Sequence, residues 1–198
     1  MRISGGRARG IRLSCPKGRI LRPTTDALRE AVFSAIGPAV VGVNFLDLCA
    51  GIGSYGLEAV SRGANGGVFV EKNSRLCPYL RENLQKVSKS AGVNPKSCQI
   101  LCGDIFKLDP ELFSPAGLIF LDPPYEQFRT NTSAFVDVLF RFLPVDGLGV
   151  LELPADISLQ LPNEFVCGHI LGKTIGKNSP KALILRRRAC VSSSCAAI

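Results

Sequence analysis

The sequence predicts an α/β fold built on an open, mostly parallel β-sheet. An apolar run at residues 43–48 leads into a glycine-rich turn at 50–56 and then a helical pattern through Arg62, the order typical of such sheets. Later apolar runs at 67–70, 97–101 and 118–121 are each followed, directly or within a short loop, by an acidic residue. Because parallel strands end at one edge of a sheet, these acids are expected to converge there.

The first 22 residues are expected to form a basic arm ahead of the main fold. Its basic residues, Arg2, Arg7, Arg9, Arg12, Lys17, Arg19 and Arg22, all precede the first acid, Asp26. Glycines and spaced apolar positions predict a β-hairpin here. The net charge of +8 and a pI near 9.3 indicate an acidic partner. A solvated cationic terminus or a targeting peptide are the alternatives, although the arm lacks the apolar core of a secretory signal.

A helix is expected after the arm. Thr24 or Thr25 offers the side-chain oxygen that caps a helix N-terminus. The candidates for its buried side are Leu28, Val32 and Ile36, or Ala31 and Ala35.

The glycine turn has the features of a ligand-binding turn. Gly51 and Gly53 let the backbone approach a ligand, and the amides that open the next helix favour a negative group. The same string matches the dinucleotide fingerprint, so a nicotinamide or flavin enzyme is an alternative. Asp47 favours a different ligand, because it ends the strand where a carboxylate can face the ammonium of an amino-acid group.

Two further acids follow the next strands. Glu71 comes about twenty residues after the glycine turn, the separation at which an acid meets ribose hydroxyls. A helix at 74–89 carries a core stripe of Leu76, Leu80, Leu84 and Val87. Asp104, in a loop after the next strand, can accept from an adenine amine, with Ile105 against the ring. Each acid alone is more commonly a cap or turn residue, whereas acids after successive strands favour one site.

The segment Asp122-Pro123-Pro124-Tyr125 follows the apolar strand at 118–121. A carboxylate and a carbonyl held still by proline can both accept hydrogen bonds from an exocyclic amine. Tyr125 can lie against the face of a flat base. A tight turn after a strand is the structural alternative.

The last third is expected to complete the sheet. A helix at 132–142 precedes a strand at 147–153, in which Glu152 is either structural or part of the base pocket. The segments 165–171 and 182–188 resemble a closing antiparallel hairpin, and the arginines at 186–188 are expected to be a solvated strand end. Residues 189–198 show no core pattern and are expected to be a disordered tail.

These motifs together resemble those of class I S-adenosylmethionine methyltransferases that methylate amino groups. The resemblance rests on Asp47, Ala50, Gly51, Gly53, Gly56, Glu71, Asp104 and the Asp-Pro-Pro-Tyr segment. More narrowly, Arg22-Pro23-Thr24-Thr25-Asp26 with Arg29, Glu30 and Phe33, preceded by Arg2-Ile3-Ser4-Gly5-Gly6 and Gly10, is similar to the RsmD family. Members of that family methylate N2 of a guanine in 16S ribosomal RNA.

The resemblance implies a Rossmann-like seven-stranded sheet with one antiparallel end strand, and a methyltransferase domain over residues 23–188. It implies S-adenosylmethionine as cofactor, bound by Asp47, Ala50, Gly51, Gly53, Gly56, Glu71, Asp104 and Ile105. Catalysis would belong to Asp122, Pro123, Pro124 and Tyr125. The partner would be 16S rRNA in the small ribosomal subunit or its assembly intermediate, with phosphates met by Arg2, Arg7, Arg9, Arg12, Arg22 and Arg29.

The chain departs from the family pattern at three positions. Cys49 replaces an aromatic residue, Ile52 replaces Ser or Thr, and Ile175 replaces the aromatic residue of a Lys-x-aromatic-Gly turn. The missing hydroxyl at Ile52 removes one hydrogen bond that the methionine end of the cofactor could receive.

Cysteine and histidine usage indicates no metal chemistry. Eight cysteines form no Cys-x-x-Cys pair, and His169 is the single histidine, placed in an apparent strand. Most cysteines are expected to be small core residues in a reducing cytoplasm, with no metal and no membrane segment. Three other functions stay open: an adenine N6 methyltransferase, a nicotinamide oxidoreductase, and a non-catalytic RNA-binding protein.

Overall fold

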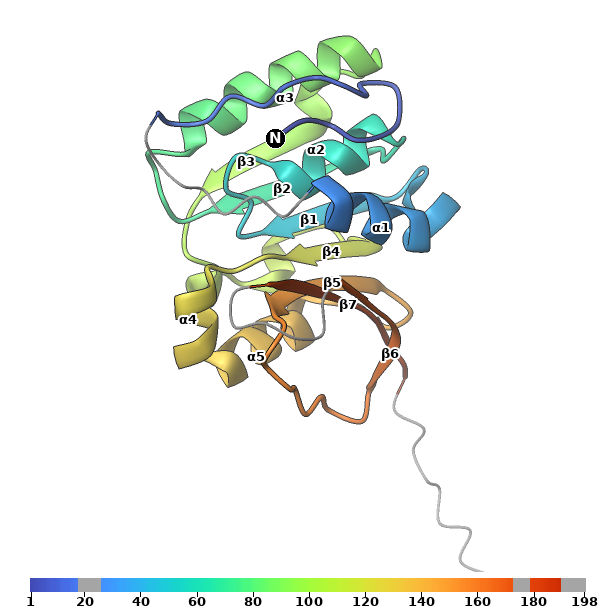
Figure 1. The fold of residues 1–198 in the computed structure, drawn as a ribbon, viewed down its shortest axis with the longest axis vertical. Helices are drawn as coiled ribbons and strands as arrows, with labels where there is room; N and C mark the ends of the chain where they lie inside the picture. The colour runs from blue at the N-terminus through green and yellow to red at the C-terminus, as the bar shows by residue number, and fades with distance from the viewer. Residues whose placement is uncertain (18–25, 173–178, 190–198) are drawn as a thin grey trace, which may run out of the picture.

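The computed structural model describes residues 1–17, 26–172 and 179–189. They contain a seven-stranded sheet in the order β3-β2-β1-β4-β5-β7-β6 (Figure 1). The strands are β1 (Asn44–Leu48), β2 (Gly66–Glu71), β3 (Cys98–Cys102), β4 (Leu118–Leu121), β5 (Leu148–Pro154), β6 (Phe165–Gly172) and β7 (Pro180–Arg187). Strands β1 to β5 are parallel, and β7 runs antiparallel between β5 and the edge strand β6. The predicted mostly parallel sheet is confirmed, with its antiparallel strand next to the edge.

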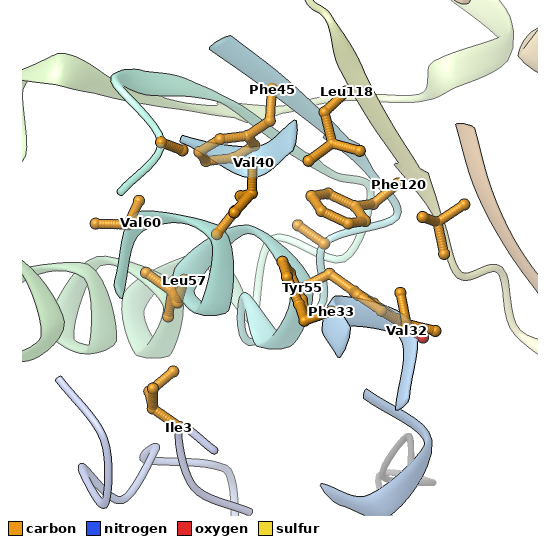
Figure 2. Packing of buried hydrophobic residues seen from close by; sticks show 14 of the residues in the cluster. Ile3, Val32, Phe33, Val40, Phe45, Tyr55, Leu57, Val60, Leu118 and Phe120 are labelled. Carbon is orange, nitrogen blue, oxygen red and sulfur yellow. The ribbon is translucent and has the colours of Figure 1, made fainter. Parts of the chain in front are cut away.

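Helices cover both faces of this sheet. They are α1 (Asp26–Ile36), α2 (Ser54–Ser61), α3 (Cys77–Ala91), α4 (Tyr125–Thr130) and α5 (Thr132–Phe142), with short 3₁₀ turns η1 (Gly37–Val40), η2 (Pro95–Ser97), η3 (Ile105–Lys107) and η4 (Pro110–Leu112). Successive strand residues point to opposite faces. Phe45, Phe69 and Phe120 therefore pack with α1, α2 and α3, whereas the neighbouring Leu46 and Ile119 pack with α4 and α5. Figure 2 shows the first of these two layers.

Gly56 explains how α2 lies so close to the sheet. A Cβ atom on Gly56 would come within 2.3 Å of the Phe69 ring and 2.6 Å of the Phe45 ring. The absent side chain thus sets the distance between helix and strands, and with it the position of the glycine turn that begins α2.

The N-terminal arm folds back on the main fold. A single antiparallel bridge pairs Arg2 with Arg12. The Ile3 amide also donates to the Ile11 carbonyl at 2.9 Å, and the Leu13 amide donates to the Met1 carbonyl at 3.2 Å, so the arm doubles back on itself without the regular strands of the expected hairpin. Ile3 is fully buried under α2, as Figure 2 shows. Further along, the Asn83 side chain of α3 accepts from the Ser14 amide at 2.7 Å and donates to the Ser14 carbonyl at 3.0 Å. Bonds to the helices thus add to the bonds that join the two halves of the arm.

Glu58 of α2 is the main anchor of the arm. Its carboxylate accepts from the Ser4 amide at 2.8 Å, the Gly5 amide at 2.7 Å and Arg62 Nε at 2.8 Å. It also pairs with Arg29 Nε at 3.2 Å. Both side chains of that pair have zero exposed surface.

The RNA-binding role predicted for Arg29 is therefore wrong in this structure. The side chain also pairs with Asp26 at 2.9 Å and donates to the Arg2 carbonyl. Its position on α1 turns it toward α2 and the arm, where no phosphate can reach it. Arg29 instead holds three segments of the chain together.

The cysteine prediction is also wrong for several residues. Cys77 at the start of α3 forms a disulfide with Cys102 at the end of β3, with their Cα atoms 6.7 Å apart. Cys15 and Cys167 are exposed. Sequence spacing could not indicate that α3 would bring Cys77 beside the end of β3.

The described residues contain neither a membrane-spanning helix nor a cluster of metal ligands. None of their helices is long and apolar enough to cross a membrane. In the same ranges, no group of three or more His, Cys, Asp or Glu side chains is arranged to hold a metal ion. His169 lies in β6, in a strand as predicted.

Several predictions fall on residues outside the described ranges. These are the caps at Thr24 and Thr25, the basic residues Arg19 and Arg22, the turn with Ile175, and residues 190–198 of the predicted tail.

Candidate active site

The predicted acids surround Cys49, the residue that follows β1. Burial raises the pKa of the Cys49 thiol well above its ordinary value, and negative charges raise it further. Those charges belong, in decreasing order of effect, to Glu71, Asp122, Asp47 and Asp104. Because β3, β2, β1 and β4 are adjacent and parallel, the four carboxylates near their carboxyl ends lie along one edge of the sheet, as the strand pattern predicted.

Cys49 itself has an unusual backbone. Its φ of 102° lies in the region that favours glycine. The Cys49 and Ala50 amides both donate to the Val70 carbonyl, at 3.1 and 2.9 Å. These two bonds to β2 hold the strained residue in place and turn the chain sharply into the glycine turn.

Asp47 lies beneath the glycine turn. Its side chain is 1% exposed, and its Oδ2 accepts from the Gly56 amide at 2.9 Å. Burial raises the pKa of Asp47 from 3.8 to about 7, against the opposing effect of the Gly56 amide; the charge of Glu71 adds to the rise. A cation bound nearby would favour the ionised form of this carboxyl.

Glu71 holds the start of the same turn, at Gly51. Its Oε2 accepts from the Gly51 amide at 2.7 Å, and its Oε1 accepts from the Asn73 amide at 2.6 Å. A Cβ built on Gly51, which has a φ of 59°, would meet nothing within 4 Å. The turn thus presents open space beside a carboxylate already oriented by two amides.

Asp104 lies at the third strand end. Its side chain caps η3 by accepting from the Phe106 amide at 3.2 Å. Lys72 forms an ion pair with it at 2.8 Å, and this bond is the main cause of the lowered pKa of Asp104. Ile105 beside it is 5% exposed, so only a small part of that side chain can meet a ring. Sequence reasoning missed Lys72, although it directly follows Glu71.

The Asp-Pro-Pro-Tyr turn links β4 to α4. Asp122 is half-buried, Pro123 is buried and Pro124 is exposed. The Pro124 carbonyl accepts from the Phe128 amide at 2.9 Å, the first bond of α4. Tyr125 is 9% exposed, and its hydroxyl donates to Glu152 Oε1 at 3.2 Å. The sequence alone left open whether Glu152 is structural or part of the base pocket, and it gave no sign of this hydrogen bond.

Ile52 is part of the hydrophobic core that includes residues of α1, α2 and α3. It is 5% exposed, and its carbonyl accepts from Asn83 Nδ2 at 3.1 Å. Asn83 therefore ties both the arm and the glycine turn to α3. Nothing in the sequence singles out this asparagine within the helical stripe.

The arginines of the arm remain outside the core. Arg2, Arg7, Arg9 and Arg12 are all exposed. The backbone of the arm is nevertheless fixed at Arg7, because the Arg7 amide donates to the Ser61 carbonyl at 2.7 Å. Arg22 lies outside the described residues. The exposed guanidinium groups thus stand on a rigidly attached segment.

Comparison with known proteins agrees with this arrangement. A family model described as conserved hypothetical protein 95 matches residues 1–166. The ribosomal RNA small subunit methyltransferase D of Haemophilus influenzae is 33% identical over 169 residues, covering 83% of this chain and 84% of that protein. The Escherichia coli K12 protein of the same name is 35% identical over 129 residues, covering 64% of this chain and 61% of that protein.

A solved structure has the same architecture. The yhhF protein of Escherichia coli superposes with a TM-score of 0.76 at 25% identity, covering 96% of this chain and 98% of that one. The chain therefore belongs to the conserved hypothetical protein 95 family, which is the RsmD family that its sequence resembles.

Proposed function

We propose that this protein transfers a methyl group from S-adenosylmethionine to the exocyclic N2 of a guanine in 16S rRNA. The substrate is the small ribosomal subunit or its assembly intermediate, which places the protein in the cytoplasm. The main supporting observation is that four adjacent parallel strands, β3, β2, β1 and β4, each have a carboxylate at or close to their carboxyl end, with Asp122 of the Asp-Pro-Pro-Tyr turn among them. The names of the relatives support the class of enzyme and of RNA.

The residues at the sheet edge fit this cofactor. Asp47 offers a buried negative charge for the amino-acid ammonium, and Glu71 offers an oriented carboxylate for ribose hydroxyls. Asp104 stays ionised beside Lys72 and can accept from an adenine amine. Open space at Gly51 leaves room for close approach to the backbone. When bound, the cofactor supplies a methyl group made electrophilic by its sulfonium.

The turn after β4 holds the acceptor. Asp122 and the Pro123 carbonyl accept hydrogen bonds from N2, which orients its attack on the methyl carbon. Methylation of N2, with the neutral thioether of the donor as leaving group, would place a positive charge on that nitrogen. Asp122 stabilises this charge until N2 loses a proton to water. The guanine must leave its helix to reach the turn, with Tyr125 beside it.

Methyl transfer to defined nucleic acids tests the proposal directly. The purified protein is incubated with labelled donor and, separately, 16S RNA, immature small subunits, mature small subunits and DNA, and the product is mapped by mass spectrometry. N2-methylguanine in 16S RNA is the expected product. N6-methyladenine, label in DNA, or RNA binding without transfer would overturn the proposal, as would binding of NADH in place of S-adenosylhomocysteine.

Cofactor affinity is expected to rise with pH. Because the raised pKa of about 7 keeps Asp47 largely protonated at pH 6, binding of an ammonium must expel that proton. We expect the affinity for S-adenosylhomocysteine to increase about tenfold between pH 6 and 8 and then level off. Calorimetry in two buffers of different ionisation enthalpy would detect the released proton.

The control for this pH effect is Asp47→Asn, which cannot ionise and should flatten the curve. Asp104 cannot be its source, because Lys72 lowers the pKa of that carboxyl away from this range. A wild-type affinity that does not change between pH 6 and 8 would show that ionisation of Asp47 is not coupled to binding of S-adenosylhomocysteine.

The exposed arginines of the arm are expected to carry salt-dependent RNA affinity. Each phosphate contact to single-stranded RNA contributes about 0.7 to the slope of log K against log salt. Arg7→Gln with Arg9→Gln should therefore reduce this slope by about 1.4. Arg141→Gln, on α5 in the opposite layer, is the control and should leave the slope unchanged. Equal slopes for wild type and the double variant would show that Arg7 and Arg9 do not contact RNA phosphates.

A further inference from the structure

Glu152 joins two tyrosines that come from distant parts of the chain. Tyr55 donates its hydroxyl to Glu152 Oε2 at 2.9 Å, and Tyr125 donates to Oε1 at 3.2 Å. Tyr55 lies in α2, directly behind the glycine turn, whereas Tyr125 ends the Asp-Pro-Pro-Tyr turn. Tyr55 is 1%, Tyr125 9% and Glu152 3% exposed. The bridge therefore connects the two halves of the proposed site through buried hydrogen bonds.

The sheet holds this bridge rigidly. The Tyr55 ring stacks on Phe120 of β4, with centroids 5.2 Å apart and planes at 21° (Figure 2). Leu151 of β5 pairs with Leu121, the last residue of the parallel strand β4, so Glu152 is the next residue of β5 and Asp122 directly follows the end of β4. Glu152 thus lies beside the acid that is proposed to hold the base.

Both tyrosines must act as donors in this arrangement. Burial, and then the negative charges of Glu152 and Asp122, raise the pKa of Tyr55 well above its ordinary value, so its hydroxyl keeps its proton. A carboxylate offers two accepting oxygens, one for each hydroxyl. A glutamine offers only one, because its amide nitrogen donates. Glu152→Gln should therefore weaken both bonds of the bridge with almost no change in volume, because one hydroxyl loses its acceptor and the other keeps only a neutral one.

We propose that Glu152 is a positioning residue, which holds Tyr125 and hence the Asp-Pro-Pro-Tyr turn in a fixed place relative to the cofactor helix α2. The role rests on the proposed function. Strand β4 fixes the turn at Asp122, and the Glu152 bond fixes it at its other end, Tyr125. Releasing that end lets the acceptor carbonyl of Pro123 move. A displacement of about 1 Å can cost on the order of a hundredfold in rate.

Kinetics of single variants test this role. Glu152→Gln and Tyr125→Phe are expected to lower kcat by about ten- to a hundredfold at saturating RNA, with the Kd of S-adenosylhomocysteine within about threefold of wild type. Tyr79→Phe removes the hydroxyl of the third tyrosine, on α3, and is the matched control with unchanged kcat. Glu152→Gln combined with Tyr125→Phe should be no slower than the slower single variant, because both changes act on the bond between Tyr125 and Glu152.

NMR spectroscopy of the tyrosines tests the bridge without measuring enzyme activity. The chain contains three tyrosines, so a protein labelled with ¹³C at tyrosine Cζ gives three NMR resonances, each assignable from a Phe variant. Glu152→Gln should shift the resonances of Tyr55 and Tyr125 and leave that of Tyr79 in place. If Glu152→Gln does not fold, Tyr125→Phe carries the kinetic test, because it removes one hydroxyl only.

The outcomes separate the two proposals. A wild-type protein that transfers no methyl group to RNA would overturn the proposed function. An active wild type with unchanged kcat in both Glu152→Gln and Tyr125→Phe would overturn the positioning role alone. Equal losses of kcat and cofactor affinity would also overturn it, since a general loss of structure would then explain the effect.

Discussion

Asp122→Ala is expected to lower kcat by about a hundredfold or more, while the Kd of S-adenosylhomocysteine stays within about threefold of the wild-type value. The asymmetry follows from when the carboxylate acts. The amine of guanine is neutral before the reaction, and positive charge develops on N2 only as the bond to the methyl carbon forms. A half-buried carboxylate at the end of β4 stabilises that charge more than it stabilises the bound state. Single-turnover transfer with saturating RNA and calorimetric titration measure the two quantities.

Two further variants sharpen this prediction. Asp122→Asn keeps an accepting oxygen without the charge, so its kcat should fall between those of wild type and the alanine variant. Asp137→Ala removes an exposed carboxylate from α5 and should change neither quantity. Parallel losses of kcat and cofactor affinity in Asp122→Ala would place Asp122 in the cofactor site and argue against its role at the amine.

The sequence could predict the convergence of the acids because the information is local. Each of these acids, Asp47 among them, lies in or just after an apolar run, and the parallel topology then brings the strand ends together. The glycine turn is local in the same sense, since Gly51, Gly53 and Gly56 act on the backbone where they stand. Such features need no knowledge of which helix packs where.

Contacts between distant residues could not be predicted in this way. The bond from Tyr55 to Glu152 spans 97 positions, and that from Ser4 to Glu58 spans 54. Arg29 follows a basic segment, which predicts a contact with RNA, but the packing of α1 against α2 buries its side chain. Periodicity gives the buried side of a helix without giving its partner, so a buried charged residue escapes this kind of reasoning.

Glu58→Gln should lower the free energy of unfolding by about 3 kcal/mol, because it leaves the buried guanidinium of Arg29 without its fully buried counter-charge. For a chain of this size that loss corresponds to a fall in Tm of roughly 10 °C. The amides of Ser4 and Gly5 also lose an acceptor, so the arm should detach more readily. Urea denaturation gives the first quantity, and the rate of trypsin cleavage at Arg7 and Arg9 reports the second.

Glu82→Gln is the matched control, because Glu82 also accepts from a serine of the arm and pairs with a basic side chain, but at the surface. Its loss should leave the unfolding free energy nearly unchanged. Arg29→Met combined with Glu58→Gln should recover part of the stability lost in Glu58→Gln, since no buried charge is then left unpaired. If Glu58→Gln has the same free energy of unfolding as Glu82→Gln, the buried pair of Glu58 with Arg29 contributes no more to stability than a surface pair. The arm would then be held by its apolar contacts, above all by the buried Ile3.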